Sequence, residues 1–203
     1  VSALKNNLDS YKSALESDPI SAFGGIISCN YKITKKLALI LNKIFLEVIV
    51  ADGFEKKALK ILKSKKNLRL IDSSKITFNE IWKFNSVDNF TLIQSEDRKI
   101  FSKKDFRIVS KKKPNKSQLD NLMFAFNVCR YAKSNAIVLA SNKSTVGIGS
   151  GQPSRLDSCE IAIDKMNKFS KIKNDIVAAS DAFFPFVDGV EKLVQSGAVS
   201  YTH

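Results

Sequence analysis

The stretch Thr145-Val-Gly-Ile-Gly-Ser-Gly-Gln-Pro-Ser-Arg155 is the most informative part of this 203-residue chain. Its three glycines, at positions 147, 149 and 151, permit backbone angles closed to other residues and a close approach to a bound group. Pro153 follows where the first turn of a helix accepts a proline. Free N–H groups at the start of that helix and the Arg155 guanidinium would converge on one point. The stretch therefore predicts an anion site, most simply for a phosphate.

Strands and helices alternate along most of the chain around this stretch. Short apolar runs predict strands at 26–29, 47–51, 68–71, 90–93, 106–109, 136–140, 144–148 and 176–179. Apolar residues at helical spacing predict helices at 4–15, 34–44, 55–63 and 119–129, one from the glycine loop to about 168, and one from about 185. The alternation predicts an α/β layered fold. A lysine-rich break at 111–115 divides it into two expected subdomains, 1–110 and 111–203.

The composition narrows the class of protein. No stretch approaches about 18 consecutive apolar residues, so the sequence predicts no transmembrane helix. The first residues, Val1 to Asn7, carry no apolar signal-peptide segment. Cys29, Cys129 and Cys159 are widely spaced and odd in number, which favours buried thiols in a reducing compartment over a disulfide framework or a metal site. We therefore expect a cytoplasmic protein with no membrane contact.

Histidine is almost absent, since the single histidine is the last residue, His203. No internal histidine is available as a general base, a member of a catalytic triad or a zinc ligand. Acid–base chemistry by residues 1–202 would have to use Lys, Asp, Glu, Tyr or Cys.

The net charge of +13 allows two interpretations. The densest basic run comprises Lys103, Lys104, Lys111, Lys112, Lys113 and Lys116. Because these lysines stand among Asn and Ser rather than among aromatic residues, a solvated basic surface accounts for them better than a nucleic-acid-binding face. The same field would attract a small phosphorylated substrate, so nucleic acid is not an expected partner.

Three segments carry candidate chemistry. Asn135 precedes a predicted strand and could exchange hydrogen bonds with an amide-like ligand, although a lone asparagine is also common in turns. The glycine loop with Arg155 supplies a cation, although such loops also serve as tight turns. The segment Ser180–Asp188 places three phenylalanines around a proline and could stack a flat ring, although such a cluster also suits a core.

Taken together and in this order, these segments resemble signature blocks of the AICAR transformylase domain, which occurs in a bifunctional purine-biosynthesis protein beside IMP cyclohydrolase. A fourth block, Asp18-Pro-Ile-Ser-Ala-Phe-Gly-Gly25, fits the same pattern. The resemblance runs from Val1 to about Val199. It implies a cytidine-deaminase-like layered α/β fold with two tandem subdomains, both incomplete here, and no cyclohydrolase domain in this chain.

The resemblance also implies an activity and a set of site residues. The family transfers a formyl group from 10-formyltetrahydrofolate, the co-substrate, to the 5-amino group of the AICAR ribotide in IMP biosynthesis. Asn135 matches the asparagine that holds the carboxamide and the reaction centre, and it is the one matched residue with a catalytic, orienting role. The positions matched to ribotide contacts are Gly24, Glu47, Asn135, Arg155 and Phe183.

Two further positions match the folate contacts of the family, namely Leu156 and Asp188. The family is homodimeric, so a homodimer is expected, and a bound monovalent cation is compatible with the resemblance. No other metal is implied.

The family's Lys-His pair has no counterpart in this sequence, since its block would lie just before Val1. We therefore expect a chain that is nearly inactive alone. Two alternatives stay open at this point. One is a basic module that binds RNA or another polyanion, and the other is a ribotide-binding protein without catalysis.

Overall fold

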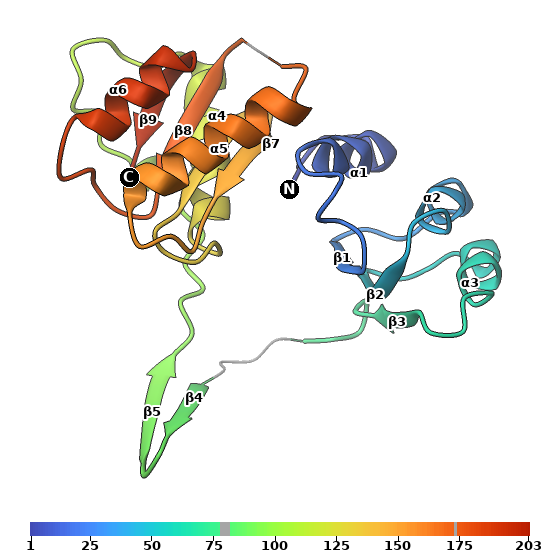
Figure 1. The fold of residues 1–203 in the computed structure, drawn as a ribbon. Coiled ribbons are helices and arrows are strands. Elements are labelled where there is room, and N and C mark those ends of the chain that lie inside the picture. The colour runs from blue at the N-terminus through green and yellow to red at the C-terminus, as the bar shows by residue number, and fades with distance from the viewer. Residues whose placement is uncertain (78–81, 173) are drawn as a thin grey trace. The chain divides into compact units, whose positions relative to one another are not determined.

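The chain divides into two compact units, which are described one at a time (Figure 1). The computed structural model describes residues 1–77, 82–172 and 174–203. The first unit combines Val1–Gly25 with Phe101–His203, and the second comprises Ile26–Ile100.

These compact units differ from the predicted division at residue 111. The start of the chain pairs with its second half, since the Ala3 N–H donates to the Lys143 carbonyl at 2.8 Å. Further along, the Lys165 ammonium pairs with the Asp18 carboxylate. These contacts place the first 25 residues in the same unit as residues 101–203.

The first unit is built on a four-stranded sheet in the order β7-β6-β8-β9. Strand β6 is antiparallel to both β7 and β8, whereas β8 and β9 are parallel. Helices α5 and α6 cover one face of the sheet and α4 covers the other (Figure 1). The elements are α1 Asn7–Glu16, α4 Lys116–Cys129, β6 Ile137–Ser141, β7 Ser144–Gly149, α5 Arg155–Phe169, β8 Ile176–Ser180, α6 Asp188–Gln195 and β9 Ala198–Thr202.

The core of this unit forms on both sides of β6. Ile137 and Leu139 pack on the side of α5 and α6, whereas Val138 and Ala140 pack on the side of α4. A strand with helices on both faces is buried along its whole length and reads as an unbroken apolar run. This is the reason why β6 and β8 were readable from the sequence.

The second unit contains a three-stranded sheet in the order β1-β2-β3. Strands β2 and β3 are parallel, as a strand–helix–strand connection requires. Thr34 caps α2, because its side chain accepts a hydrogen bond from the Leu37 N–H at 3.3 Å. The elements are β1 Gly25–Cys29, α2 Lys35–Leu41, β2 Leu46–Ala51, α3 Lys56–Leu62 and β3 Arg69–Asp72.

A β-hairpin completes the secondary structure of the second unit. Strands β4 (Trp82–Val87) and β5 (Phe90–Ser95) are antiparallel, and every residue of both strands is exposed. The predicted strand at 90–93 is therefore confirmed.

The predicted α/β class is confirmed, but three details were wrong, one of which is that strand β4 was not predicted. Residues 106–109 form no strand, because Phe106 packs its ring edge-on against Phe126 of α4 while Val109 is 85% exposed. A short 3-10 helix, Lys103–Asp105, precedes them. Near the C-terminus, strand β9 was not predicted from the sequence.

Within the described ranges, no helix combines the length and apolar composition that a membrane span requires. The described residues also contain no cluster of three or more His, Cys, Asp or Glu side chains that could hold a metal ion.

The three cysteines are free and buried, as predicted. Burial raises the pKa of the Cys129 thiol to about 12 and that of Cys159 to about 11. At about pH 8 we expect roughly one Cys159 thiol in a thousand to be ionised. Ellman's reagent should therefore label the native chain at least about a hundredfold more slowly than the chain in concentrated urea. Fast labelling of two or more thiols in the native chain would contradict this burial.

Candidate functional site

The register of the sheet brings three distant segments of the first unit to one edge. Ile137, the first residue of β6, lies opposite both Gly149 at the end of β7 and Ser180 at the end of β8. The residues just before β6 and just after β7 and β8 must therefore lie close together. These are the segments around Asn135, the glycine loop and Asp181.

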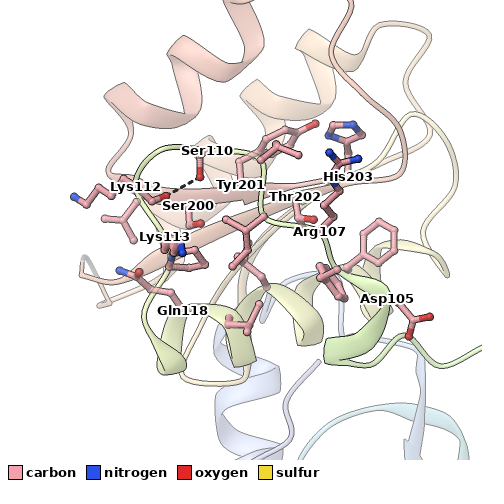
Figure 2. A pocket seen from close by; sticks show the side chains of 18 of the residues that line it. Asp105, Arg107, Ser110, Lys112, Lys113, Gln118, Ser200, Tyr201, Thr202 and His203 are labelled. Carbon is pink, nitrogen blue, oxygen red and sulfur yellow. Dashed lines mark hydrogen bonds between the residues drawn. The ribbon is translucent and has the colours of Figure 1, made fainter.

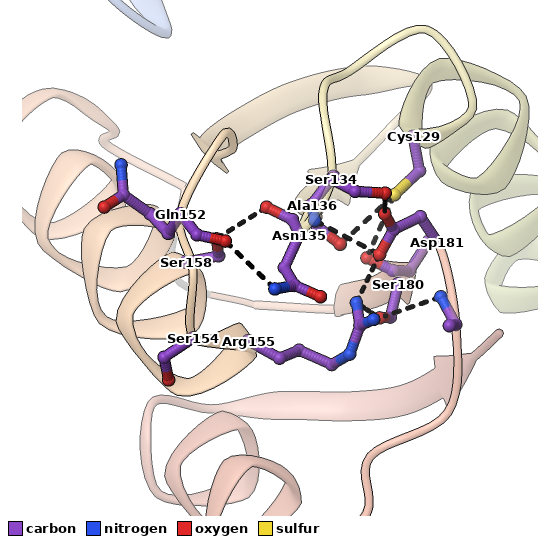
Figure 3. Close-up of polar contacts among 12 residues, drawn as sticks. Cys129, Ser134, Asn135, Ala136, Gln152, Ser154, Arg155, Ser158, Ser180 and Asp181 are labelled. Atoms are coloured by element: carbon purple, nitrogen blue, oxygen red, sulfur yellow. Dashed lines mark hydrogen bonds and ion pairs between the residues drawn. The ribbon is translucent and has the colours of Figure 1, made fainter.

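Asp181 is the centre of the polar contacts at this edge (Figure 3). Its carboxylate accepts hydrogen bonds from the Ser134 hydroxyl, from the Ala136 N–H at 3.1 Å and from Arg155 Nη1. Arg155 Nη1 also donates to the Ser180 hydroxyl at 2.9 Å. The side chains of Asp181 and Arg155 are each 13% exposed, so this ion pair is largely shielded from water.

The surroundings of Asp181 favour its charged form. Burial by itself raises the pKa of the carboxyl, because it penalises the charge. The hydrogen bonds from Ser134, Ala136 and Arg155 and the positive charge of Arg155 outweigh burial and hold the pKa below its ordinary value. Asp181 is therefore a fixed anion at neutral pH.

Asn135 fastens the start of β6 to the glycine loop. Its side-chain Nδ2 donates to the carbonyls of Gln152 at 2.9 Å and Pro153 at 2.8 Å. Its backbone carbonyl accepts a hydrogen bond from the Ser158 hydroxyl at 2.6 Å. The Oδ1 atom has no hydrogen-bond partner among the described residues, so this acceptor is available to a ligand (Figure 3).

The start of α5 differs from the predicted anion site. Ser154 is the N-cap, and its side chain accepts hydrogen bonds from the Leu156 N–H at 3.1 Å and the Asp157 N–H at 3.4 Å. Pro153 therefore precedes the cap instead of occupying the first helical position. The acid of Asp157 also stands in the first turn, so these two N–H groups are not free for a phosphate.

Two of the three glycines serve packing. A Cβ atom on Gly147 would lie 2.1 Å from the Ala162 carbonyl oxygen, and one on Gly149 would lie 1.8 Å from the Ser158 oxygen. Only glycine lets β7 approach α5 this closely. Gly151 is different, because its φ of +70° favours glycine while a Cβ there would meet no atom nearer than 4.0 Å. The prediction that alternate glycines approach a ligand was therefore wrong for the first two.

The other predicted contacts fall into two groups. Two of these residues are close in sequence to the polar contacts of Asp181. Leu156 is half-buried in the first turn of α5, and Phe183, three residues after β8, is 64% exposed. Asp188 is exposed at the start of α6. By contrast, Gly24 lies in the turn before β1, and Glu47 is an exposed residue of β2 in the second unit.

Three residues at or near this edge were not predicted from the sequence. Asp181 stands inside the quoted segment Ser180–Asp188 and Ser134 directly precedes Asn135, but their pairing depends on the register of β6 and β8. His203 was treated as a terminal residue, yet its ring stacks on Tyr201 at 5.6 Å and lies edge-on to Phe183 at 6.5 Å. The unexpected strand β9 carries it there.

Comparison with known proteins bears on the whole chain. The bifunctional purine biosynthesis protein PurH of Wigglesworthia glossinidia brevipalpis is 44% identical over 193 residues, which cover 94% of this chain and 36% of that protein. PurH of Chlorobium phaeobacteroides (strain BS1) is 39% identical over 193 residues, which cover 95% of this chain and 37% of that protein. The chain thus spans a little over a third of the length of these curated relatives.

A family model agrees with these relatives. The model described as AICARFT/IMPCHase bienzyme matches residues 1–165, which include Asn135 and Arg155. This match confirms the resemblance that the sequence blocks indicated. The chain belongs to the AICARFT/IMPCHase bienzyme family.

Proposed function

We propose that the edge formed by Asn135, Arg155 and Phe183 binds the AICAR ribotide. We further propose that the chain takes part in formyl transfer from 10-formyltetrahydrofolate to the 5-amino group of that ribotide in purine biosynthesis. Membership of the bienzyme family supports this proposal. The observation that carries it is the arrangement of Asn135, which lies just before β6, and Arg155, the first residue of α5, because hydrogen bonds hold both at the same edge.

The chemistry of the edge suits a polar, planar ligand. Asn135 Oδ1 would accept a hydrogen bond from a carboxamide or an amine, because its Nδ2 is already used by the glycine loop. Arg155 has five N–H donors, of which those on Nη1 face Ser180 and Asp181, so the others are left for a ligand. The exposed ring of Phe183 would stack against a flat base.

In formyl transfer the amine nitrogen attacks the formyl carbon, the bond from that carbon to the folate nitrogen breaks, and one proton passes from the amine to the folate nitrogen that leaves. A positioned general base typically contributes about 10²–10⁴-fold to such a step. The 203 residues hold a single histidine, His203, beside Phe183. We therefore propose that this chain alone binds the ribotide more readily than it turns it over.

The other implications of the resemblance are proposals of the same kind. We propose a cytidine-deaminase-like layered fold, a homodimer and a cytoplasmic location. Leu156 and Asp188 are the proposed folate contacts, and Gly24 and Glu47 are proposed further contacts of the ribotide.

A titration with the AICAR ribotide tests the proposed site. Ligand at about 100 times its dissociation constant stabilises a protein by about 2.7 kcal/mol. For a chain of this size we expect the melting temperature to rise by about 5–10 °C.

Asn135→Ala and Arg155→Lys should each raise the dissociation constant at least about tenfold, as measured by calorimetry. Glu160→Gln, an exposed change on the same helix, is the matched control and should leave binding unchanged. A chain that shows neither heat nor a melting shift with the ribotide would contradict the proposal.

A further inference from the structure

The Arg155 guanidinium is held at one of its three nitrogen atoms. Nη1 carries two hydrogens and donates to two acceptors, the Ser180 hydroxyl at 2.9 Å and Asp181 Oδ1 (Figure 3). No other group of the described residues accepts a hydrogen bond from this guanidinium. The hydrogens on Nε and Nη2 therefore remain for a ligand. Because the guanidinium is planar, these two atoms can present their N–H groups side by side, as a fork that matches two oxygen atoms.

Asp181 is itself fixed from the side opposite to Arg155. Its Oδ1 accepts a hydrogen bond from the Ala136 N–H at 3.1 Å, and its Oδ2 accepts one from the Ser134 hydroxyl. The Asp181 N–H donates in turn to the Ala136 carbonyl at 3.3 Å. Ala136 is fully buried directly before β6, so the sheet sets the orientation of the carboxylate. The carboxylate then sets the orientation of the guanidinium.

A fixed guanidinium is an advantage for binding. An arginine side chain has many rotamers, and a ligand that contacts a free arginine must immobilise it at a cost in entropy. In this chain the Arg155–Asp181 ion pair is formed without a ligand, and each of its side chains is 13% exposed. Part of that cost is therefore met by folding, which is how a binding site is preorganised.

The ion pair is separate from a groove of about 670 Å³ in the same unit (Figure 2). Residues of β9, of α4 and of the loop before α4 line that groove. Asn135, Arg155 and Asp181 are not among the lining residues. A ligand of Arg155 therefore belongs at the edge of β6 and not in that groove.

We propose that Asp181 is the positioning residue of the ribotide site, which holds Arg155 so that its Nε and Nη2 donors face the ligand. The inference rests on the proposed function, in which Arg155 contacts the ribotide. Asp181 itself would not touch the ligand. Its oxygens already accept hydrogen bonds from Ser134, Ala136 and Arg155, and a carboxylate repels the phosphate of a ribotide.

The Asp181→Asn variant distinguishes positioning from a simple effect of charge. Removal of a negative charge near an anionic ligand would by itself strengthen binding. Loss of positioning has the opposite sign, and we expect the dissociation constant of the AICAR ribotide to rise at least about tenfold. Calorimetry measures it at a temperature where circular dichroism shows the variant to be folded. Asp157→Asn, which removes an exposed carboxylate two residues after Arg155, is the matched control and should change the constant less than twofold.

A double-mutant cycle tests whether Asp181 acts through Arg155. In the Arg155→Met background no guanidinium remains to be positioned, so Asp181→Asn should change the dissociation constant less than twofold. A tenfold effect of Asp181→Asn in both backgrounds would overturn the positioning role.

The nitrogen-15 NMR spectrum of the Arg155 guanidinium needs no ligand. The hydrogen bonds of Nη1 should slow rotation about the Nε–Cζ bond, so that Nη1 and Nη2 give separate signals in the parent chain. The signals are assigned by their loss in Arg155→Met, and they should merge in Asp181→Asn. Ser180→Ala removes only one acceptor of Nη1 and is the second variant if Asp181→Asn does not fold. It should speed the rotation and weaken ribotide binding about threefold.

The outcomes separate this inference from the proposed function. Ribotide binding by Asp181→Asn that is as tight as in the parent chain, or tighter, would overturn the inference and leave the proposed function intact. A parent chain that binds no ribotide would overturn both. Merged Nη signals in a parent chain that binds the ribotide would again overturn the inference alone, because Arg155 would then not be held.

Discussion

The Gly149→Ala variant is expected to unfold at a markedly lower urea concentration than the parent chain. The added Cβ would lie 1.8 Å from the Ser158 carbonyl oxygen and 2.7 Å from its carbon. Both atoms belong to the backbone of α5, so no side chain can rotate away to make room. Helix α5 would have to move off β7, and overpacking of this kind costs about 3 kcal/mol at its upper range. Urea denaturation followed by circular dichroism measures the loss.

Gly151→Ala is the matched control for this change. A Cβ at Gly151 meets only Lys133 Cβ, at 4.0 Å, so the cost comes from the positive φ of +70° alone. We expect that cost to be about 1 kcal/mol. Equal unfolding midpoints for the alanine variants of Gly149 and Gly151 would show that close packing of β7 on α5 does not stabilise the unit.

The second large effect is expected for Asp181→Asn. The change keeps the shape of the Asp181 side chain but removes its negative charge. The Arg155 guanidinium then loses its ion-pair partner, although the Arg155 side chain is only 13% exposed. An uncompensated cation at a shielded site costs about 3 kcal/mol or more. We therefore expect a loss of about this size in the free energy of unfolding. A second change, Arg155→Met, made in the Asp181→Asn background should recover part of the loss, because it removes the unpaired charge.

The same carboxyl predicts a dependence of stability on pH. Because the pKa of Asp181 in the folded chain lies below its ordinary value of 3.8, its contribution is fully present above about pH 5. The contribution is lost as the pH falls through the folded pKa. The parent chain should therefore lose more stability than Asp181→Asn between about pH 5 and pH 2. Parallel pH profiles for the two chains would contradict the lowered pKa.

Glu160→Gln controls for the removal of a carboxylate as such. Glu160 pairs with Lys192 between α5 and α6, but both side chains are about two-fifths exposed or more. Exposed ion pairs contribute little to stability, so this change should leave the unfolding midpoint nearly where it was. A loss as large as that of Asp181→Asn would mean that shielding from water is not what distinguishes the Asp181 pair.

Much of the fold was readable from the sequence because apolar spacing reports burial. The unbroken apolar runs of β6 and β8 and the helical spacing of α4 gave elements of the correct type, with bounds within a few residues. Asn135 and Arg155 were also predicted as site residues, because they lie in blocks of sequence that resemble a known family. The structure then showed that both side chains belong to one cluster.

The remaining features depend on contacts that spacing along the chain does not encode. Ser154, and not Pro153, directly precedes α5 as its N-cap, because a serine hydroxyl can cap two N–H groups and a proline cannot. In the sequence alone, the glycines at 147 and 149 cannot be distinguished from ligand-binding glycines, because the close contacts that require them are made by the backbone of α5. Asp181 becomes important only when the register of β6 and β8 brings Ala136 beside it.

The burial of β6 on both faces has a consequence for how its alignment is chosen. In a sheet with one solvent-exposed face, a register shift of one residue moves the buried apolar side chains into water, which makes the shift unfavourable. Strand β6 has apolar partners on both faces. A register shift would therefore move each of its side chains from one buried face to the other, and burial alone would not oppose it. Polar contacts that exist in a single alignment, such as Ala136 N–H to Asp181, must therefore select it. In this chain Asp181, the carboxylate that pairs with Arg155, therefore also determines which alignment of the sheet is the native one.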